Sequence, residues 1–123
     1  MQIEISESSD IMNYQNDYDT HDVNLNIHYT IPNEIWNKVI DVFSSMPYWI
    51  EDEEQRKDCL FWYDEKDCVE LYCSVEPNGI QISGLMMYEI WRKWYPKLKN
   101  KLTETLGYEI GEPEKGYSFK YWK

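Results

Sequence analysis

The sequence predicts an α+β fold: an antiparallel sheet of about four to six strands with two main helices, in the order β-α-β-β-β-α-β. Three observations predict it. Residues 23–31 alternate between apolar and polar, residues 59–83 contain short strand-like segments broken by turn signals, and two longer stretches have apolar residues at helical spacing. With 123 residues, of which 42% are hydrophobic, we expect residues 1–123 to form a single domain with a substantial core.

The first part of the chain is expected to be mostly irregular. We predict a short strand at Gln2–Ser6 and a long or mobile acidic loop over residues 6–22, where apolar residues show little periodicity. In Val23–Ile31 every second residue is apolar, which is typical of a strand with one buried face. This alternation places Asn26 and His28 on the solvent face.

The centre of the chain is predicted to be a helix followed by a meander. Pro32 suits the first turn of a helix because its missing N–H costs nothing there, and Pro47 ends the helical pattern. Strands are predicted at Cys59–Tyr63, Cys68–Glu76 and Ile80–Ser83, with Pro77-Asn78-Gly79 as the turn before the third.

A second helical stretch is predicted from Leu85 to Leu106, with Gly107 as its C-terminal stop. Pro96 interrupts it, and an interior proline costs about 3 kcal/mol, so we expect a kink or two separate helices. The chain is predicted to end with a strand at Tyr117–Trp122.

The net charge of −11 is unevenly distributed. Residues 1–64 hold 14 acids and 3 bases, whereas residues 65–123 hold 9 of each. A field of one sign on part of a small domain speeds encounters with cationic partners and repels nucleic acid and anionic membranes. We therefore expect one basic protein partner, no nucleic acid and no membrane, although the acids serve solubility equally well. The bases between Arg92 and Lys101 are interpreted as the solvated face of the second helix.

Residues that carry chemistry are few. The two histidines, His21 and His28, have no second ligand at metal spacing, and the chain has neither a glycine-rich phosphate loop nor a G-x-S-x-G elbow. We therefore expect no enzyme, no metal and no cofactor. The odd count of three cysteines favours reduced thiols and a cytoplasmic protein, with Cys73 in the core.

A small acidic α+β domain, rich in aromatic residues and without a catalytic set, resembles the immunity proteins of bacterial polymorphic-toxin and contact-dependent inhibition systems. The resemblance rests on the acidic first half, the absence of a catalytic site, and the segments Ile31-Pro32-Asn33-Glu34-Ile35-Trp36 and Leu106-Gly107-Tyr108-Glu109-Ile110-Gly111-Glu112-Pro113. It implies a cytosolic inhibitor that binds one cognate toxin, commonly a basic nuclease, and covers its active site.

The aromatic residues divide into two groups. Trp36, Trp91 and Trp94 lie on apolar helical stripes and are expected in the core, while other rings flank acids and form either a contact surface or a cap on the sheet. Our hypothesis is that the partner-binding surface consists of Asp17, Asp19, Asp22, Trp49, Glu51, Asp52, Glu53, Glu54, Asp58 and Trp62. Two alternatives remain open: a phage-encoded nucleic-acid mimic that inhibits a host defence protein, and a small ligand-binding domain.

Overall fold

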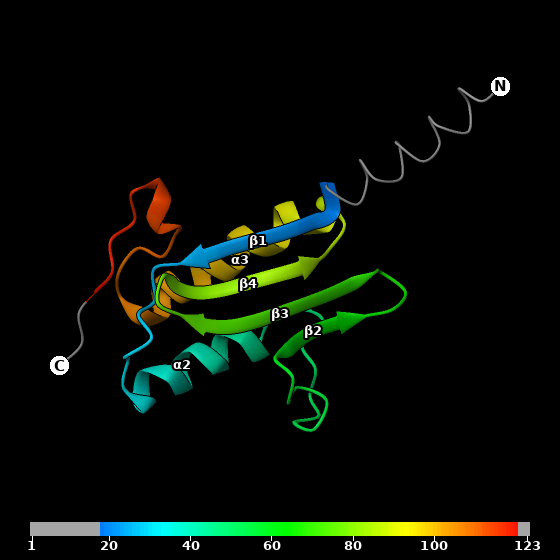
Figure 1. The fold of residues 1–123 in the computed structure, drawn as a ribbon, viewed down its shortest axis with the longest axis horizontal. Coiled ribbons are helices and arrows are strands. Elements are labelled where there is room, and N and C mark those ends of the chain that lie inside the picture. Colours follow the sequence, from blue (N-terminus) through cyan, green and yellow to red (C-terminus); the bar gives the residue numbers. More distant parts are fainter. Residues whose placement is uncertain (1–17, 121–123) are drawn as a thin grey trace.

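A computed structural model of the chain describes residues 18–120, and it confirms the predicted α+β class with one antiparallel sheet and two helices (Figure 1). The elements are β1 (Thr20–Leu25), α2 (Asn33–Ser44), β2 (Leu60–Asp64), β3 (Val69–Glu76), β4 (Gly79–Leu85), α3 (Tyr88–Leu106) and the short 3-10 helix η1 (Pro113–Lys115). The four strands lie in the order β1-β4-β3-β2, and every neighbouring pair is antiparallel.

The core lies between one face of the sheet and the two helices. Alternate residues of β3 and β4, including Leu71 and Ile82, are fully buried, as are Leu98 and Leu102 of α3. Trp62 of β2 is also fully buried, and its Nε1 donates a hydrogen bond to the Phe43 carbonyl of α2 (3.2 Å). Figure 1 shows α3 behind the sheet and α2 below it, while no described helix covers the other face, which we call the open sheet face.

The first described strand differs from its prediction. β1 begins at Thr20 and ends at Leu25, whereas the alternation predicted Val23–Ile31. The chain turns sharply after β1, where the Ile27 N–H donates to the Leu25 carbonyl (2.8 Å), and Leu25, Asn26 and Ile27 are all fully buried. The prediction that Asn26 faces solvent is therefore wrong. So is the predicted loop where it overlaps β1, over residues 20–22; residues 6–17 and the strand predicted at Gln2–Ser6 lie outside the described residues.

The helix after Pro32 and the meander are confirmed. α2 begins at Asn33 directly after Pro32 and ends at Ser44, shortly before Pro47. The three meander strands appear within one or two residues of their predicted bounds, because each is delimited by local turn signals.

Helix α3 is a single helix, so of the two expected outcomes at Pro96, a kink or two separate helices, the second is wrong. Trp91 and Trp94 before the proline and Leu98 and Leu102 after it are all buried on one face. Burial of this continuous stripe outweighs the loss of one helical hydrogen bond, since each large apolar side chain contributes about 1.5–3 kcal/mol.

The segment after α3 does not form the predicted strand: residues 117–120 have no strand partner, and residues 121 and 122 lie outside the described part. The segment is held by the Asn26 side chain instead. Its Nδ2 donates to the carbonyls of Glu109 (3.0 Å) and Ser118 (2.7 Å), and its Oδ1 accepts from the Gly111 N–H (2.8 Å). The Tyr117 ring lies against Gly111 so closely that a Cβ there would come within 2.5 Å of it.

Candidate functional site

Residues 51–58, which we call the acidic loop, connect the segment after α2 to β2 and project beyond the sheet at the β2 edge (Figure 1). The loop is a series of turns with its own hydrogen bonds. Asp52 stabilises the loop with both its side chain and its backbone. Its Oδ1 accepts the Glu54 N–H (2.9 Å), and its backbone carbonyl accepts the N–H groups of Gln55 (3.1 Å) and Arg56 (3.3 Å). The acids of this loop are therefore carried on an ordered backbone.

The charges of the acidic loop do not cancel at its surface. Arg56 is turned inward: its guanidinium lies 4.5 Å from the centre of the Trp49 ring and donates to the Ile50 carbonyl. By contrast, four acidic side chains are exposed and make no hydrogen bond or salt bridge with any residue of 18–120. They are Glu51, Glu53, Glu54 and Asp58. The loop thus presents carboxylates, with Lys57 as its one outward base.

Backbone strain is concentrated around the acidic loop. Among residues 18–120, three non-glycine residues have positive φ: Tyr48 (77°), Cys59 (69°) and Cys68 (55°). Tyr48 and Cys59 flank the loop, and Cys68 lies in the turn between β2 and β3. Such conformations cost about 1–3 kcal/mol each and persist where the surrounding structure enforces them, as at binding sites. The strained residues are therefore concentrated at the β2 end of the molecule.

The open sheet face continues the acidic loop across β2 and β3. Tyr63 pairs with Glu70 and Leu60 pairs with Tyr72, so these side chains share the open face. The Tyr72 hydroxyl donates to Glu70 Oε2 (2.9 Å), and this hydrogen bond is the largest reason why the pKa of Tyr72 is raised, with a smaller contribution from the charge of Asp58. Tyr63 and Tyr72 remain 45% and 37% exposed, which leaves both rings free to contact a partner.

The structure divides the predicted partner-binding residues into groups. Glu51, Asp52, Glu53, Glu54 and Asp58 share the acidic loop, with Trp49 half-buried at its base against Phe61 and Trp62. The prediction is wrong for Trp62, because its fully buried ring cannot contact a partner. Tyr63 and Tyr72 were among the rings expected beside acids, but the predicted partner-binding set omitted them and Glu70, although the alternation in 68–76 already placed Glu70 and Tyr72 outward.

Asp19 and Asp22 lie at the opposite edge of the sheet, and Asp17 lies outside the described residues. Asp19 Oδ1 accepts the N–H of Tyr88 (3.1 Å), the first residue of α3, and so caps that helix, whose own N-cap residue Met87 makes no side-chain cap. Asp22 Oδ1 accepts a hydrogen bond from Gln81 (2.7 Å) on the open sheet face. Because adjacent strands lie about 4.8 Å apart, three spacings separate β1 from β2, and these two acids are not part of the acidic loop.

His21 is held in place by contacts within the fold. The His21 ring stacks on Trp91 with 4.0 Å between ring centres, and its Nε2 contacts the Met86 carbonyl (2.8 Å). Burial lowers the pKa of His21, against the opposing effects of that carbonyl and the charge of Asp19. Among residues 18–120 no three His, Cys, Asp or Glu side chains gather into a metal-binding cluster.

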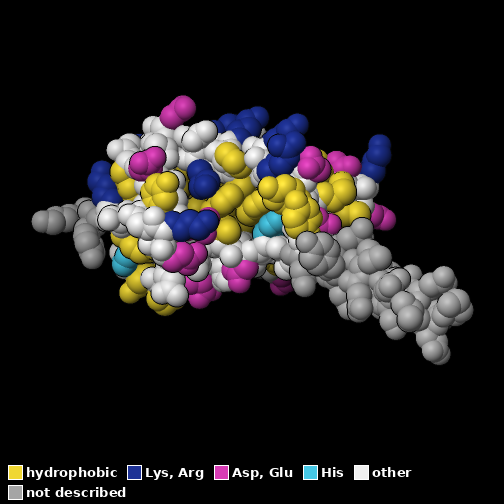
Figure 2. Space-filling model, turned by 90° about the horizontal axis from the view of Figure 1, so that it is seen from above, with side chains coloured by type: hydrophobic (Ala, Val, Ile, Leu, Met, Phe, Trp, Pro, Cys, Tyr) yellow, Lys and Arg dark blue, Asp and Glu magenta, His cyan; other side chains and the backbone are white. Residues whose placement is uncertain are grey.

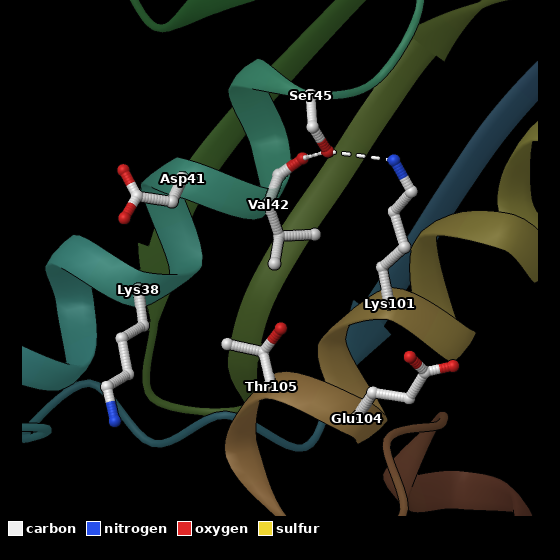
Figure 3. A pocket seen from close by; sticks show the side chains of 7 residues that line it. All are labelled: Lys38, Asp41, Val42, Ser45, Lys101, Glu104 and Thr105. Carbon is white, nitrogen blue, oxygen red and sulfur yellow. Dashed lines mark hydrogen bonds between the residues drawn. The ribbon is translucent and has the colours of Figure 1, made fainter.

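A pocket of about 250 Å³ lies between α2 and α3 (Figure 3). Lys101 of α3 donates to Ser45 Oγ (2.9 Å), which in turn donates to the Val42 carbonyl at the end of α2 (2.6 Å). Asp41 and Glu104, the two acids that line it, point in opposite directions (Figure 3), so the pocket offers no paired carboxylates for acid–base chemistry. This pocket is best explained as the polar seam between the two helices.

Apolar side chains are also exposed at the junction of β4 and α3. Tyr18 and Tyr88 lie with ring centres 4.5 Å apart, and Leu85 and Met87 beside them are 43% and 39% exposed. Seen from above relative to Figure 1, the molecule shows hydrophobic side chains grouped in the middle of its surface and charged ones of both signs around them (Figure 2). The cluster of Tyr18, Leu85, Met87 and Tyr88 is mainly apolar and lies at the β1 edge, so it is distinct from the acidic loop.

No protein-family model, no curated protein and no solved structure matches this chain. Within residues 18–120, no helix combines the length and the apolar character needed to cross a membrane. The candidate binding surface consists of the acidic loop and the adjoining open sheet face, with Glu70, Tyr63 and Tyr72. We call it the acidic–tyrosine surface.

Proposed function

We propose that this protein binds a basic protein partner through the acidic–tyrosine surface and neutralises it by covering it, without catalysing a reaction. A toxin such as a nuclease is the partner that the resemblance to immunity proteins implies. The observation that carries the proposal is the asymmetry of the acidic loop. Four of its carboxylates face solvent without a described partner, while its arginine is turned inward onto Trp49.

The chemistry of such a partner fits this surface. A nuclease must present positive charge to the phosphates of its substrate, so an inhibitor that places carboxylates there both competes with the substrate and is steered to the site. A contact of this kind covers about 800 Å² on each protein. Tyr63 and Tyr72 supply rigid aromatic area beside the acids, and tyrosine is enriched at the energetic centres of interfaces.

The order of the loop supports binding rather than solubility alone. Acids that serve only solubility need no fixed backbone, whereas this loop is held by the hydrogen bonds of Asp52 and by the Arg56 contacts. A loop that is already ordered loses less conformational entropy when it binds, which increases affinity without adding contacts.

The proposal is tested by capture of the partner with a tagged full-length chain from its native lysate, washed at low and at high salt. The test variant is Glu51→Lys/Glu53→Lys/Glu54→Lys, because these side chains make no described contact; Asp52 is left unchanged because it orders the loop. The matched control is Glu104→Lys/Glu109→Lys/Glu114→Lys, which changes the net charge by the same amount at exposed acids elsewhere.

We expect one stoichiometric basic protein on the wild-type bait and on the control bait, held at low salt. With the purified partner, the test variant should associate at least about tenfold more slowly, since the association of oppositely charged proteins is dominated by such steering. Equal association of the test and control variants would refute the acidic loop as the interface. An empty bait, in a lysate that contains the products of the neighbouring genes, would refute a dedicated inhibitor.

The same capture distinguishes the nucleic-acid mimic. A mimic copies the charge of a duplex and so binds several unrelated DNA-binding proteins, whereas a dedicated inhibitor binds one. Several such proteins on the wild-type bait, all lost with the test variant, would replace the toxin inhibitor with the mimic.

A further inference from the structure

A second pocket lies on the helical side of the molecule, between the N-terminal half of α3 and the turn at Pro47 and Tyr48. It has a volume of about 340 Å³. Pro47, Tyr48 and Ile90 line it, with Pro47 exposed and the other two half-buried, whereas Trp94, which also lines it, is only 3% exposed. The Trp94 Nε1 donates to the Pro47 carbonyl (3.2 Å), so the one polar atom of the indole is already satisfied. The aromatic and aliphatic part of this pocket is therefore a surface for an apolar group.

The Tyr48 wall is fixed in place before any ligand arrives. Its backbone has a φ of 77°, its carbonyl accepts the Tyr63 N–H (2.9 Å), and its hydroxyl donates to Asp67 Oδ2 (2.8 Å). A left-handed backbone at a bulky residue costs about 1–2 kcal/mol. The hydrogen bonds to Tyr63 and Asp67 offset this cost and keep Tyr48 in its conformation. Strain at the wall of an apolar pocket is the arrangement found at pre-formed binding sites.

The rim of the pocket is cationic. Glu89 is the one acid that lines it, and both Nε and Nη2 of Arg92 contact its Oε2, at 3.2 and 3.1 Å. Lys93 and Lys97 also line it, lie one helical turn apart and are exposed, and neither forms a salt bridge within residues 18–120. The nearby charges that oppose an anion are Glu89, which is paired with Arg92, and Asp67, which accepts the Tyr48 hydroxyl. The other acids of the chain count for less where they lie beyond about 8 Å, because salt screens exposed charges at that distance.

We propose that this pocket binds an amphipathic anion, with a flat apolar body against Pro47, Tyr48 and Ile90 and a carboxylate between Lys93 and Lys97. The pocket is an open groove of about 340 Å³, so it holds one face of a flat ring system and leaves the other face to solvent. None of these residues belongs to the acidic–tyrosine surface, so this site is independent of the proposed function.

The test is a calorimetric titration of the full chain with 2-naphthoate, which combines two fused rings with one carboxylate. Two further probes separate the parts of the ligand: 2-naphthylmethanol keeps the rings without the charge, and acetate keeps the charge without the rings. The indole N–H resonance of Trp94, assigned by its absence in Trp94→Phe, reports where the probe binds. Binding of one naphthoate per chain that moves this resonance is expected, with both other probes weaker.

The lysines are tested with Lys93→Gln/Lys97→Gln against the control Lys38→Gln/Lys57→Gln, which removes the same charge at exposed lysines outside the pocket. Two exposed ion pairs together change the dissociation constant by about 3- to 30-fold. We expect the test pair to weaken naphthoate binding by that factor and the control pair to leave it within about twofold. The proposal is overturned if naphthoate does not saturate, if both pairs behave alike, or if either partial probe binds as tightly as naphthoate.

Discussion

Replacement of Asn26 by alanine should destabilise the protein more than any surface substitution, although the sequence gives Asn26 the appearance of a surface residue. Its side chain makes three hydrogen bonds at 2.7 to 3.0 Å and is fully buried. The orientation of the amide is fixed by chemistry: the Gly111 N–H can only donate, so the oxygen must face it and the nitrogen must face the two carbonyls. Each lost bond costs about 1 kcal/mol net, and a buried donor left without an acceptor costs about 1–3 kcal/mol.

We therefore expect Asn26→Ala to lower the free energy of unfolding by about 3–5 kcal/mol, a large share of the 5–15 kcal/mol typical of a domain. Urea unfolding followed by tryptophan fluorescence measures it. The matched control is Asn24→Ala, two residues earlier on the open sheet face, where the side chain makes no described hydrogen bond and the change should stay within about 0.5 kcal/mol.

A second measurement isolates the bond to Gly111. The Gly111 amide should exchange with solvent much faster in Asn26→Ala, while the amides of β3 lose protection only as far as global stability falls. A loss below about 1 kcal/mol, or an unchanged rate at Gly111, would refute the role of Asn26 as the anchor of the C-terminal segment.

Three further predictions concern a histidine, a proline and an arginine. Because burial lowers the pKa of His21 below its ordinary value of 6.5, the folded state binds fewer protons than the unfolded state; stability that is present above pH 6.5 is lost as the pH falls below it. Urea midpoints at pH 7.5 and 5.5 should therefore differ less for His21→Gln than for wild type, and an identical difference would count against the assignment. Pro96→Ala should raise the melting temperature, because Pro96 is exposed and alanine both restores a helical hydrogen bond and removes the clash of the ring with the preceding turn, together about 1–3 kcal/mol; an unchanged or lower temperature would contradict this. Arg56→Ala should speed hydrogen exchange at the amides of the acidic loop, because it removes the Trp49 and Ile50 contacts; Lys57→Ala is the control, and similar exchange in both variants would show that Arg56 does not order the loop.

The elements that could be predicted from the sequence are those with local signals. α2 is delimited by Pro32 and Pro47, and the turn before β4 by Pro77-Asn78-Gly79, so their bounds follow from residues within a few positions. The class of the fold follows from these elements, because a meander joined by short turns forms an antiparallel sheet and its apolar side must be covered.

The errors arise where tertiary packing, rather than the local sequence pattern, determines the structure. The alternation in residues 23–31 continues past the end of β1, but Asn26 is drawn into the core by backbone groups more than 80 residues away along the chain. Pro96 breaks a helix in isolation, yet the stripe from Trp91 to Leu102 is buried along its whole length. The contacts of Asn26 leave no pattern in the neighbouring sequence, whereas the apolar stripe on both sides of Pro96 is visible there and outweighs the proline.

The acidic loop and the rings beside it could be predicted from the sequence, whereas which of those rings are exposed depends on the register of the sheet. β2 has an irregular register between Leu60 and Trp62, which turns Trp62 toward Phe43 and leaves Tyr63 outside. The sequence of the five residues of β2 does not show that such a bulge occurs within it. Asp19 shows the converse, because its carboxylate caps a helix that begins 69 residues later.

The position of β1 in the sheet also determines the order in which the chain can fold. β2, β3 and β4 pair with their neighbours in sequence, whereas Thr20 of β1 pairs with Leu85. The hydrogen bonds of the Asn26 side chain need residues as far along the chain as Ser118. Closing long loops is slow, since their entropy is lost before their contacts form. During synthesis β1 must therefore remain unpaired until β4 has left the ribosome, and the Asn26 side chain remains without its partners until the segment up to Ser118 has followed. The meander and α3 are then the expected nucleus, and β1 and the C-terminal segment lock together onto it in the last step.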